Sequence, residues 1–282
     1  MSKVAIVTDS STFLPKEFLD KYHIRVVPIM LIWSGEELRD GIDIQPRDFY
    51  IRLQTAREMP GTSQPSPIAF KEVFDELLAK DYDILGIFIS SKLSGTFAAA
   101  EQALAMLPNK NIEIIDSLTG SMGAGWPILA TARAALKGAN LAECKALAMK
   151  CLDNVGILLV LDTLEYLHRG GRIGGAQRLL GDALNLKPIL EVVDGSFIGL
   201  ERVRTHQKAV SRLVELLKER IGGRSPVRLG ALHANAPDLA NKLLDEAASS
   251  VHPIETIIAD VSPAVGAHLG PGTVGFAFMA GI

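Results

Sequence analysis

The chain has 282 residues, and its 29 basic and 32 acidic side chains give a formal net charge of −3. This balance argues against a nucleic-acid-binding protein, because such proteins usually carry a basic stripe or patch. The mean hydropathy is positive, at +0.23, yet no apolar run reaches the roughly 20 residues that a membrane-spanning helix needs. We therefore expect no nucleic-acid partner and no stable membrane insertion.

The first residues, MSKVAIVTDSS, lead directly into a predicted strand, so we expect no signal peptide. Cys144 and Cys151 lie in an alanine-rich helical stretch, where two turns separate them by about 10 Å, too far for a disulfide. This pattern favours reduced thiols and a cytoplasmic location. The spacings typical of zinc sites are missing, so we expect no metal.

Strands and helices alternate through the first half of the chain, which is typical of an α/β fold with a parallel sheet. Residues 24–45 interrupt this alternation and predict a hairpin-like excursion. Strands are predicted at 4–7, 84–89, 112–115 and 156–161. Helices are predicted at 15–22, from Pro46, at 67–80, 95–107, 119–137 and 141–152.

The second half has a different order of elements. A helix-like stretch to about residue 184 is followed by a hairpin, a helix, a strand, a helix and two strands. The strands are predicted at 188–195, 196–204, 227–234, 254–260 and 273–280, and the later helices at 206–221 and 237–249. We therefore predict an N-terminal doubly wound domain with a mainly parallel sheet, residues 1–160, and a smaller C-terminal α+β domain, residues 161–282.

Short polar clusters follow four of the predicted strands: TDSS (8–11), SSKLSGT (90–96), DSLTGS (116–121) and DTLE (162–165). The carboxyl ends of parallel strands meet at one edge of a sheet, where open α/β sheets place their ligands. We therefore expect these clusters to surround a binding site. The alternative is that their side chains only cap the following helices.

Ser94-Gly95-Thr96 stands between a predicted strand and a predicted helix, so hydroxyls and backbone N–H groups point at one spot there. Thr62 and Ser63, in the proline-bounded segment GTSQPSP, also precede a predicted helix. Both segments are expected to be loops, and both could direct donors at one anion. Helix capping alone is again the alternative.

A serine-dependent hydrolase of small esters is another interpretation of Ser94. His268 would act as the base, and Asp9 or Asp116 as the orienting acid. The surrounding sequence lacks the Gly-x-Ser-x-Gly turn of α/β hydrolases. It also lacks the Gly-x-x-x-x-Gly-Lys-Ser/Thr spacing of a nucleotide loop.

Two glycine-rich segments complete the candidates. HRGGRIGG contains Arg172, which could bind a phosphate compound, although an interdomain elbow is the alternative. VGAHLGPG (265–272) places His268 beside Gly-Pro-Gly, which predicts a fixed loop that holds the imidazole in one place.

Taken together, nine segments in chain order resemble the DegV family, whose members act in some bacteria as fatty-acid-binding subunits of a fatty acid kinase. They are VAIVTDSS, VVPIMLI followed by GEELRDGID, TSQPSP, ISSKLSGTF, IDSLTGSMGAG, LEYLHRGGRIGG, NLKPIL, RVRT and HLGPGTVG. The resemblance implies a two-domain, non-catalytic protein that binds one palmitate- or oleate-like acid and no cofactor. It would present the carboxylate to a partner kinase, whose acyl-phosphate product can feed phospholipid synthesis.

The resemblance also assigns roles to residues. Thr62 and Ser94 would bind the carboxylate, and His268 would complete the hydrogen-bond network around it. Arg172 would lie near the pocket mouth, and Arg204 of RVRT would contact the partner kinase. The candidate ligand-binding residues are therefore Thr62, Ser63, Ser94, Gly95, Thr96, Arg172 and His268, with no catalytic residue and no metal ligand.

The physical chemistry agrees with a fatty acid ligand. Burial of a sixteen-carbon chain gives roughly 12 kcal/mol of gross transfer free energy, at about 0.8 kcal/mol per methylene. A buried carboxylate needs donors, and hydrogen bonds from two hydroxyls and an imidazole would hold its pKa down. Two residues depart from the family pattern: His168 stands where many members carry Lys or Arg, and Phe97 where Tyr is common.

Overall fold

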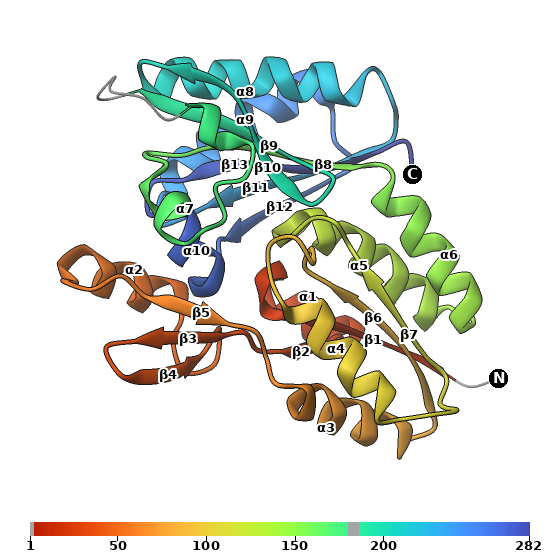
Figure 1. The fold of residues 1–282 in the computed structure, drawn as a ribbon. Coiled ribbons are helices and arrows are strands. Elements are labelled where there is room, and N and C mark those ends of the chain that lie inside the picture. Colours follow the sequence, from red (N-terminus) through yellow and green to blue (C-terminus); the bar gives the residue numbers. More distant parts are fainter. Residues whose placement is uncertain (1–2, 180–185) are drawn as a thin grey trace.

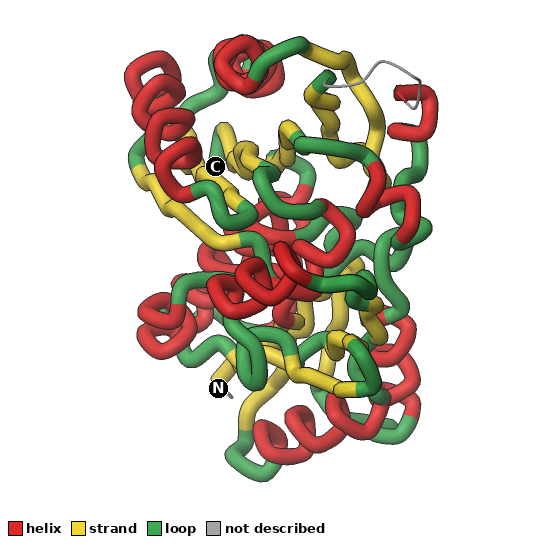
Figure 2. Tube along the Cα trace, turned by 90° about the vertical axis from the view of Figure 1, so that its left-hand side faces the viewer, coloured by secondary structure: helices red, strands yellow, loops and turns green. Residues whose placement is uncertain are grey.

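The computed structural model describes residues 3–179 and 186–282. Figure 1 shows two lobes, each built on a β-sheet, with α5 (Ser121–Leu136) lying between them. Viewed from the side, the lobes are stacked one above the other, with helices at the junction (Figure 2). This architecture confirms the predicted mixed α/β class with a parallel sheet and a separate second sheet.

The first sheet is parallel throughout, in the order β2-β1-β6-β7. Its strands are β1 (Lys3–Asp9), β2 (Arg25–Val27), β6 (Tyr82–Phe88) and β7 (Ile112–Asp116). Most side chains of β1 and β6 are buried, as expected for a parallel sheet covered on both faces. The covering helices are α1 (Lys16–Tyr22), α3 (Pro67–Leu78), α4 (Thr96–Ala105), α5 and α6 (Leu141–Leu152).

The second sheet has six strands in the order β10-β9-β8-β13-β11-β12, and β11 and β12 form its parallel pair. The strands are β8 (Val155–Val160), β9 (Lys187–Val193), β10 (Ser196–Val203), β11 (Val227–His233), β12 (Glu255–Asp260) and β13 (Val274–Ala280). Helices α8 (His206–Ile221) and α9 (Pro237–Val251) pack on this sheet. The short helices α7 (Glu165–Arg169) and α10 (Pro263–Leu269) belong to the same lobe (Figure 1).

The predicted excursion forms a small antiparallel sheet beside the first lobe. Its order is β4-β3-β5, and its strands are β4 (Glu36–Arg39), β3 (Met30–Trp33) and β5 (Gly61–Ser63). Helix α2 (Pro46–Thr55) begins at Pro46, as predicted. The expectation that GTSQPSP forms only a loop is wrong for residues 61–63, because their backbone pairs with β3.

The two lobes share one apolar core. Helix α5 packs against β1 on one side and against β13 and β8 on the other, and Trp126 Nε1 donates to the Ala277 carbonyl at 3.0 Å. One cluster of buried residues therefore includes Ile6 of the first sheet as well as Ile157 and Leu232 of the second. The chain passes from the first sheet to the second between β7 and β8. Strand β8 therefore pairs in the second lobe, although we predicted it at the end of the N-terminal domain, residues 1–160.

The polar clusters do not all share one edge. TDSS, SSKLSGT and DSLTGS follow the parallel strands β1, β6 and β7 of one sheet, as expected. DTLE follows β8, which pairs antiparallel with both neighbours in the other sheet. The expectation of four clusters at one edge is therefore wrong for the fourth, because β8 belongs to the second lobe.

Two short 3-10 helices complete the described elements. Residues Ala176–Leu179 form one of them, and the rest of the predicted helix-like stretch to about 184 lies outside the described residues. Asn185 of the NLKPIL segment lies outside them too. The other 3-10 helix, Ser10–Thr12, follows β1.

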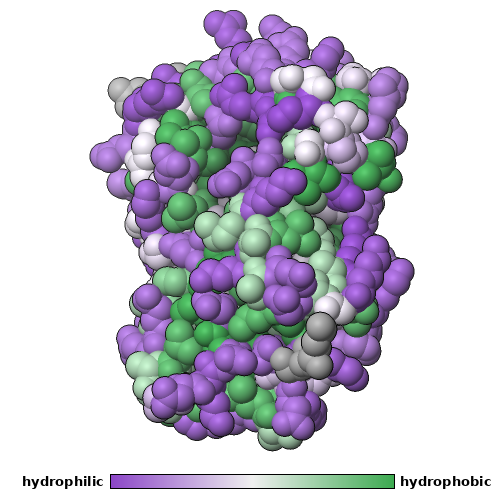
Figure 3. Space-filling model, turned by 90° about the vertical axis from the view of Figure 1, so that its right-hand side faces the viewer, coloured by the Kyte–Doolittle hydropathy of each residue, from purple (hydrophilic) through white to green (hydrophobic). Residues whose placement is uncertain are grey.

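Within residues 3–179 and 186–282, no helix combines the length and the apolar composition needed to cross a bilayer. Figure 3 shows the face on the side of α6, where hydrophilic and hydrophobic residues are interspersed. Cys144 and Cys151 are both buried and free.

Candidate functional site

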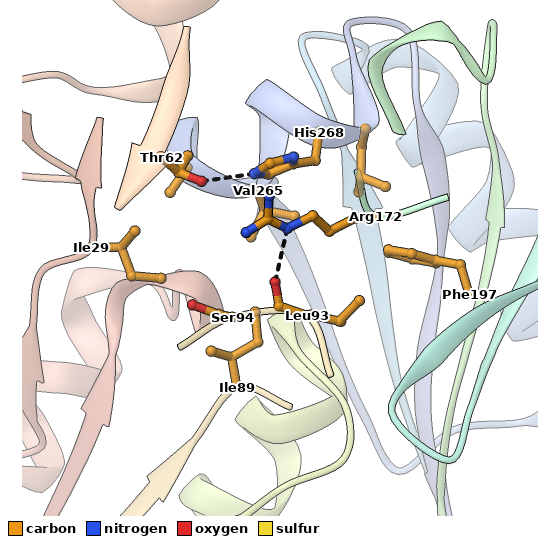
Figure 4. A pocket seen from close by; sticks show the side chains of 11 residues that line it. Ile29, Thr62, Ile89, Leu93, Ser94, Arg172, Phe197, Val265 and His268 are labelled. Carbon is orange, nitrogen blue, oxygen red and sulfur yellow. Dashed lines mark hydrogen bonds between the residues drawn. The ribbon is translucent and has the colours of Figure 1, made fainter. Parts of the chain in front are cut away.

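Four polar side chains from different elements line one pocket between the lobes (Figure 4). They are Thr62 on β5, Ser94 before α4, Arg172 after α7 and His268 on α10. The other lining residues are apolar: Ile29, Ile89, Leu93, Phe197, Ala264, Val265 and Leu269. The pocket thus combines a small polar group of side chains with a mainly hydrocarbon wall.

Thr62 and His268 are joined by a hydrogen bond of 2.8 Å between Oγ1 and Nε2. His268 lies in the last turn of α10, so the expectation of a loop at 265–272 is wrong for its first residues. The helix forms because Pro263 occupies its first turn and Ser262 caps it, accepting from the Val265 N–H at 3.2 Å. Gly270, with φ +79°, then ends it.

The imidazole of His268 is neutral at pH 7. Burial, and secondarily the positive charge of Arg172, lower its pKa from 6.5 to about 4. Among the described residues, its Nδ1 has no hydrogen-bond partner. Gly170 leaves room for this side of the ring, since a Cβ there would lie 2.2 Å from Nδ1.

Arg172 connects the two lobes at the pocket. Its Nε donates to the Leu93 carbonyl at 3.1 Å, and its Nη1 donates to the Gly170 carbonyl at 2.6 Å. In Figure 4 the guanidinium lies between the Thr62–His268 pair and Ser94. No acidic side chain lines this pocket among the described residues, so its electrostatics favour an anion.

Ser94 belongs to a turn that starts α4. Its Oγ lies 2.8 Å from Thr96 Oγ1 and accepts from the Thr96 N–H at 3.3 Å. The capping alternative therefore describes part of its role. Asp9 holds the preceding strand end, accepting from the Ile89 N–H at 2.8 Å and from the Ser11 N–H at 2.9 Å.

The remaining candidates lie outside the pocket wall. Ser63 and Gly95 are exposed, and Thr96 is buried behind Ser94. Ser63 Oγ makes a 3.4 Å contact with the Gln64 carbonyl. Arg204 is exposed just beyond the end of β10. Their binding roles stay predictions.

Asp40 is a buried carboxylate that the sequence patterns did not single out. It accepts from Ser10 Oγ at 2.6 Å and from the Ala264 N–H, in the first turn of α10, at 3.3 Å. Burial raises its pKa from 3.8 to about 7. One sequence feature could have pointed to Asp40: in GEELRDGID it directly follows a short strand. Asp40 thereby positions the helix that carries His268.

A second compartment adjoins the pocket. Five residues line both spaces: Ile89, Leu93, Phe197, Val265 and Leu269. The second space continues toward Ile157, Leu159 and Leu232, and Ser121 is its one polar side chain among the described residues. The first compartment has a cavity volume of about 50 Å³, and the second has one of about 40 Å³.

The geometry lacks the parts of a serine hydrolase. His268 bonds to Thr62, and no described carboxylate orients its Nδ1 as a catalytic triad requires. Asp9 is engaged with backbone N–H groups instead. A metal site is also missing from the described ranges, which hold no group of three or more His, Cys, Asp or Glu side chains in a suitable arrangement.

A family model described as "Uncharacterised protein, DegV family" matches residues 3–281. The chain belongs to the DegV family. A DegV domain-containing protein of Caldanaerobacter subterraneus is 34% identical over 279 residues, which cover 99% of each chain.

Solved DegV structures show the same fold. A DegV family protein from Thermus thermophilus, described as binding fatty acid, is 32% identical and superposes with a TM-score of 0.93 over 99% of both chains. Bacillus subtilis DegV, described as a fatty acid binding protein, is 30% identical with a TM-score of 0.89, over 99% of this chain and 100% of that one.

Proposed function

We propose that the chain binds a long-chain fatty acid, with its carboxylate at Thr62, Ser94, Arg172 and His268. The observation that carries this proposal is the convergence of these four side chains at one end of an apolar pocket. Hydroxyls and a guanidinium supply donors to an ionised carboxylate. As its Nε2–H tautomer, the neutral imidazole donates to Thr62 Oγ1, which leaves the Thr62 O–H free to donate to the carboxylate. The DegV proteins of T. thermophilus and B. subtilis, described as fatty acid binding, support the ligand class.

The acyl chain would occupy the two apolar compartments in succession. Their five shared residues stand between the polar end and the inner space. Because ligand pockets usually measure about 300–1,000 Å³, the side chains of Leu93 and Phe197 would have to move for a palmitate- or oleate-like chain to enter. Affinity would be lower than the gross transfer free energy implies, since ordering the chain and these side chains opposes binding.

The apolar wall distinguishes this ligand from a phosphate compound. Arg172 alone would suit a phosphate, but seven of the eleven lining residues are apolar. A small phosphate ester would leave this surface without a partner, whereas an acyl chain covers it.

The protein would act as a non-catalytic, cytoplasmic carrier, in keeping with its two buried free thiols. It would present the carboxylate to a partner fatty acid kinase, and the acyl phosphate would feed phospholipid synthesis. Arg204 is exposed, so its guanidinium is accessible to such a partner. Its role rests on the family resemblance.

The proposal is tested by extracting denatured, purified protein with organic solvent and identifying acyl chains by mass spectrometry. We expect about one fatty acid per wild-type chain, the stoichiometry of a single site, and less in Thr62→Ala and Ser94→Ala. Thr55→Ala and Ser91→Ala are matched controls, because both side chains are exposed and neither lines the pocket. Extracts without fatty acid, combined with no binding of added palmitate, would contradict the proposal.

A further inference from the structure

Ser121 carries a buried hydroxyl in the inner, otherwise apolar compartment. The residue is 8% exposed, and its Oγ has no hydrogen-bond partner among the described residues. Its neighbours in the compartment wall include Ile157, Leu159 and Leu232. An unpaired polar group in such a place destabilises the fold, so it calls for a reason.

Helix capping does not provide that reason. Ser121 is the first residue of α5, and the cap position before it is Gly120, which has no side chain to cap the helix. The Ser121 hydroxyl makes none either, within the described part of the chain. The residue also has φ +45°, a left-handed backbone conformation that is uncommon for residues other than glycine. A side chain kept in this conformation for packing alone would not need a hydroxyl.

A resident water does not provide it either. A buried water typically makes about three hydrogen bonds, and apolar cavities stay dry. The other side chains that line this compartment are apolar, so a water there would find one side-chain partner. The hydroxyl therefore lacks a partner that the described residues could supply.

The inner compartment adjoins the polar pocket, and five residues line both. If a fatty acid lies with its carboxylate at Thr62 and Ser94, its chain extends toward Ser121. This step rests on the proposed function. The Ser121 hydroxyl would then face the acyl chain some way along from its carboxylate. An ordinary saturated acyl chain has no hydrogen-bond acceptor there.

We propose that Ser121 is a specificity-determining residue that hydrogen-bonds an oxygen substituent on the acyl chain. The ligand class is long-chain fatty acids with an oxo or hydroxy group in the chain. An oxo group fits best, because it needs one donor and the Ser121 O–H supplies one. When such an acid binds, the Ser121 hydroxyl and the oxygen substituent of the acyl chain pair with each other, and both would otherwise be buried without a partner.

The experiment measures dissociation constants of wild type and Ser121→Ala for stearate and for stearates with an oxo or hydroxy group at carbon 10 or 12. For each protein, the dissociation constant for stearate is divided by that for the substituted acid. For at least one substituted acid, we expect this ratio to be about fivefold to tenfold higher in wild type than in Ser121→Ala. Stearate itself should bind both proteins alike. Equal ratios in the two proteins for all four substituted acids would overturn the assignment.

A second variant and a stability measurement distinguish ligand binding by the hydroxyl from a structural role. Ser121→Gly removes the hydroxyl and relaxes the positive φ, so it replaces Ser121→Ala if that variant fails to fold, and should lose the same selectivity. A marked drop in thermal stability in both variants would show that the hydroxyl has a structural partner, and would overturn the inference. Failure of wild type to bind stearate and every substituted acid would instead refute the proposed function, and this inference with it.

Discussion

Thr62 Oγ1 and His268 Nε2 lie 2.8 Å apart, although 206 positions separate the two residues in the chain. Thr62 stands on the small sheet beside the first lobe, and His268 stands on a helix of the second. Arg172 crosses the same junction to reach the Leu93 carbonyl. The polar end of the pocket therefore exists only when both lobes are in place, so its ligand affinity reports on their relative position.

The Thr62 hydroxyl should contribute directly to fatty acid affinity. We expect Thr62→Ala to raise the dissociation constant for palmitate by about tenfold, since a hydrogen bond to a charged group contributes about 1.5–3 kcal/mol and part is retained by the other donors. Thr62→Ser keeps the hydroxyl and should stay within about twofold of wild type. Titration calorimetry checks both values, and an unchanged affinity in Thr62→Ala would count against the site.

The space beside the His268 ring depends on Gly170. A Cβ at Gly170 would lie 2.2 Å from His268 Nδ1, so Gly170→Ala should displace the imidazole and weaken palmitate binding. The matched control is Gly171→Ala. A Cβ there meets nothing within 4 Å, but φ +69° makes it strained. We expect Gly171→Ala to lose about 1 kcal/mol of stability and to keep its affinity for palmitate. Weakened palmitate binding in Gly171→Ala, with unchanged binding in Gly170→Ala, would contradict this interpretation.

Asp40 should make stability depend on pH. Its pKa is about 7 in the folded state, above the ordinary 3.8. Between pH 3.8 and about 7, the Asp40 carboxyl group is therefore protonated in the folded protein and deprotonated in the unfolded chain. This contribution to stability is complete below pH 3.8 and is lost as the pH rises through about 7, by up to about 4 kcal/mol.

Urea unfolding of wild type and Asp40→Asn from about pH 4 to about pH 8 tests this dependence. The unfolding free energy of wild type should fall relative to that of the variant as the pH rises. His268 acts with the opposite sign, because its pKa is lowered from 6.5 to about 4 and its contribution is lost as the pH falls below 6.5. Both proteins carry His268, so its effect cancels in the difference. A constant difference between the two curves would refute the role of Asp40.

Charge reversal at Arg204 should separate lipid binding from presentation. Because Arg204 is exposed and outside the pocket wall, we expect Arg204→Glu to retain fatty acid like wild type. Phosphorylation of the bound acid by a partner kinase should drop at least about tenfold, because changing a charge at an interface slows association with the partner. Equal loss of retention and phosphorylation would show that the residue acts through the pocket.

Local signals predicted most of the regular elements. Helix α6 has the predicted bounds, 141–152, because Asn140 and Glu143 form a capping box at its start. The predicted hairpin of strands 188–195 and 196–204 also forms, and Asp194 and Gly195 at its turn have positive φ, as a two-residue Asp-Gly turn requires. These features depend on neighbours in the chain, which is why the sequence reveals them.

Elements that depend on distant partners were missed or misplaced. The three-residue strand β5 is held by β3, and nothing in GTSQPSP itself shows this pairing. Helix α10 is short, and the Gly-Pro-Gly that follows it conceals it. Spacing alone could not bring Thr62, Ser94 and His268 together; that expectation came from the family resemblance. The burial of Asp40 depends on Ser10 and Ala264, from both sides of the lobe junction.

The path of the acyl chain can be seen directly in a crystal structure with palmitate brominated at its terminal carbon. We predict that the carboxylate lies within hydrogen-bond distance of Thr62 and Ser94. We also predict that the anomalous bromine signal lies in the compartment lined by Ile157 and Leu232. A carboxylate bound elsewhere, or bromine outside these two compartments, would contradict fatty acid binding at this site.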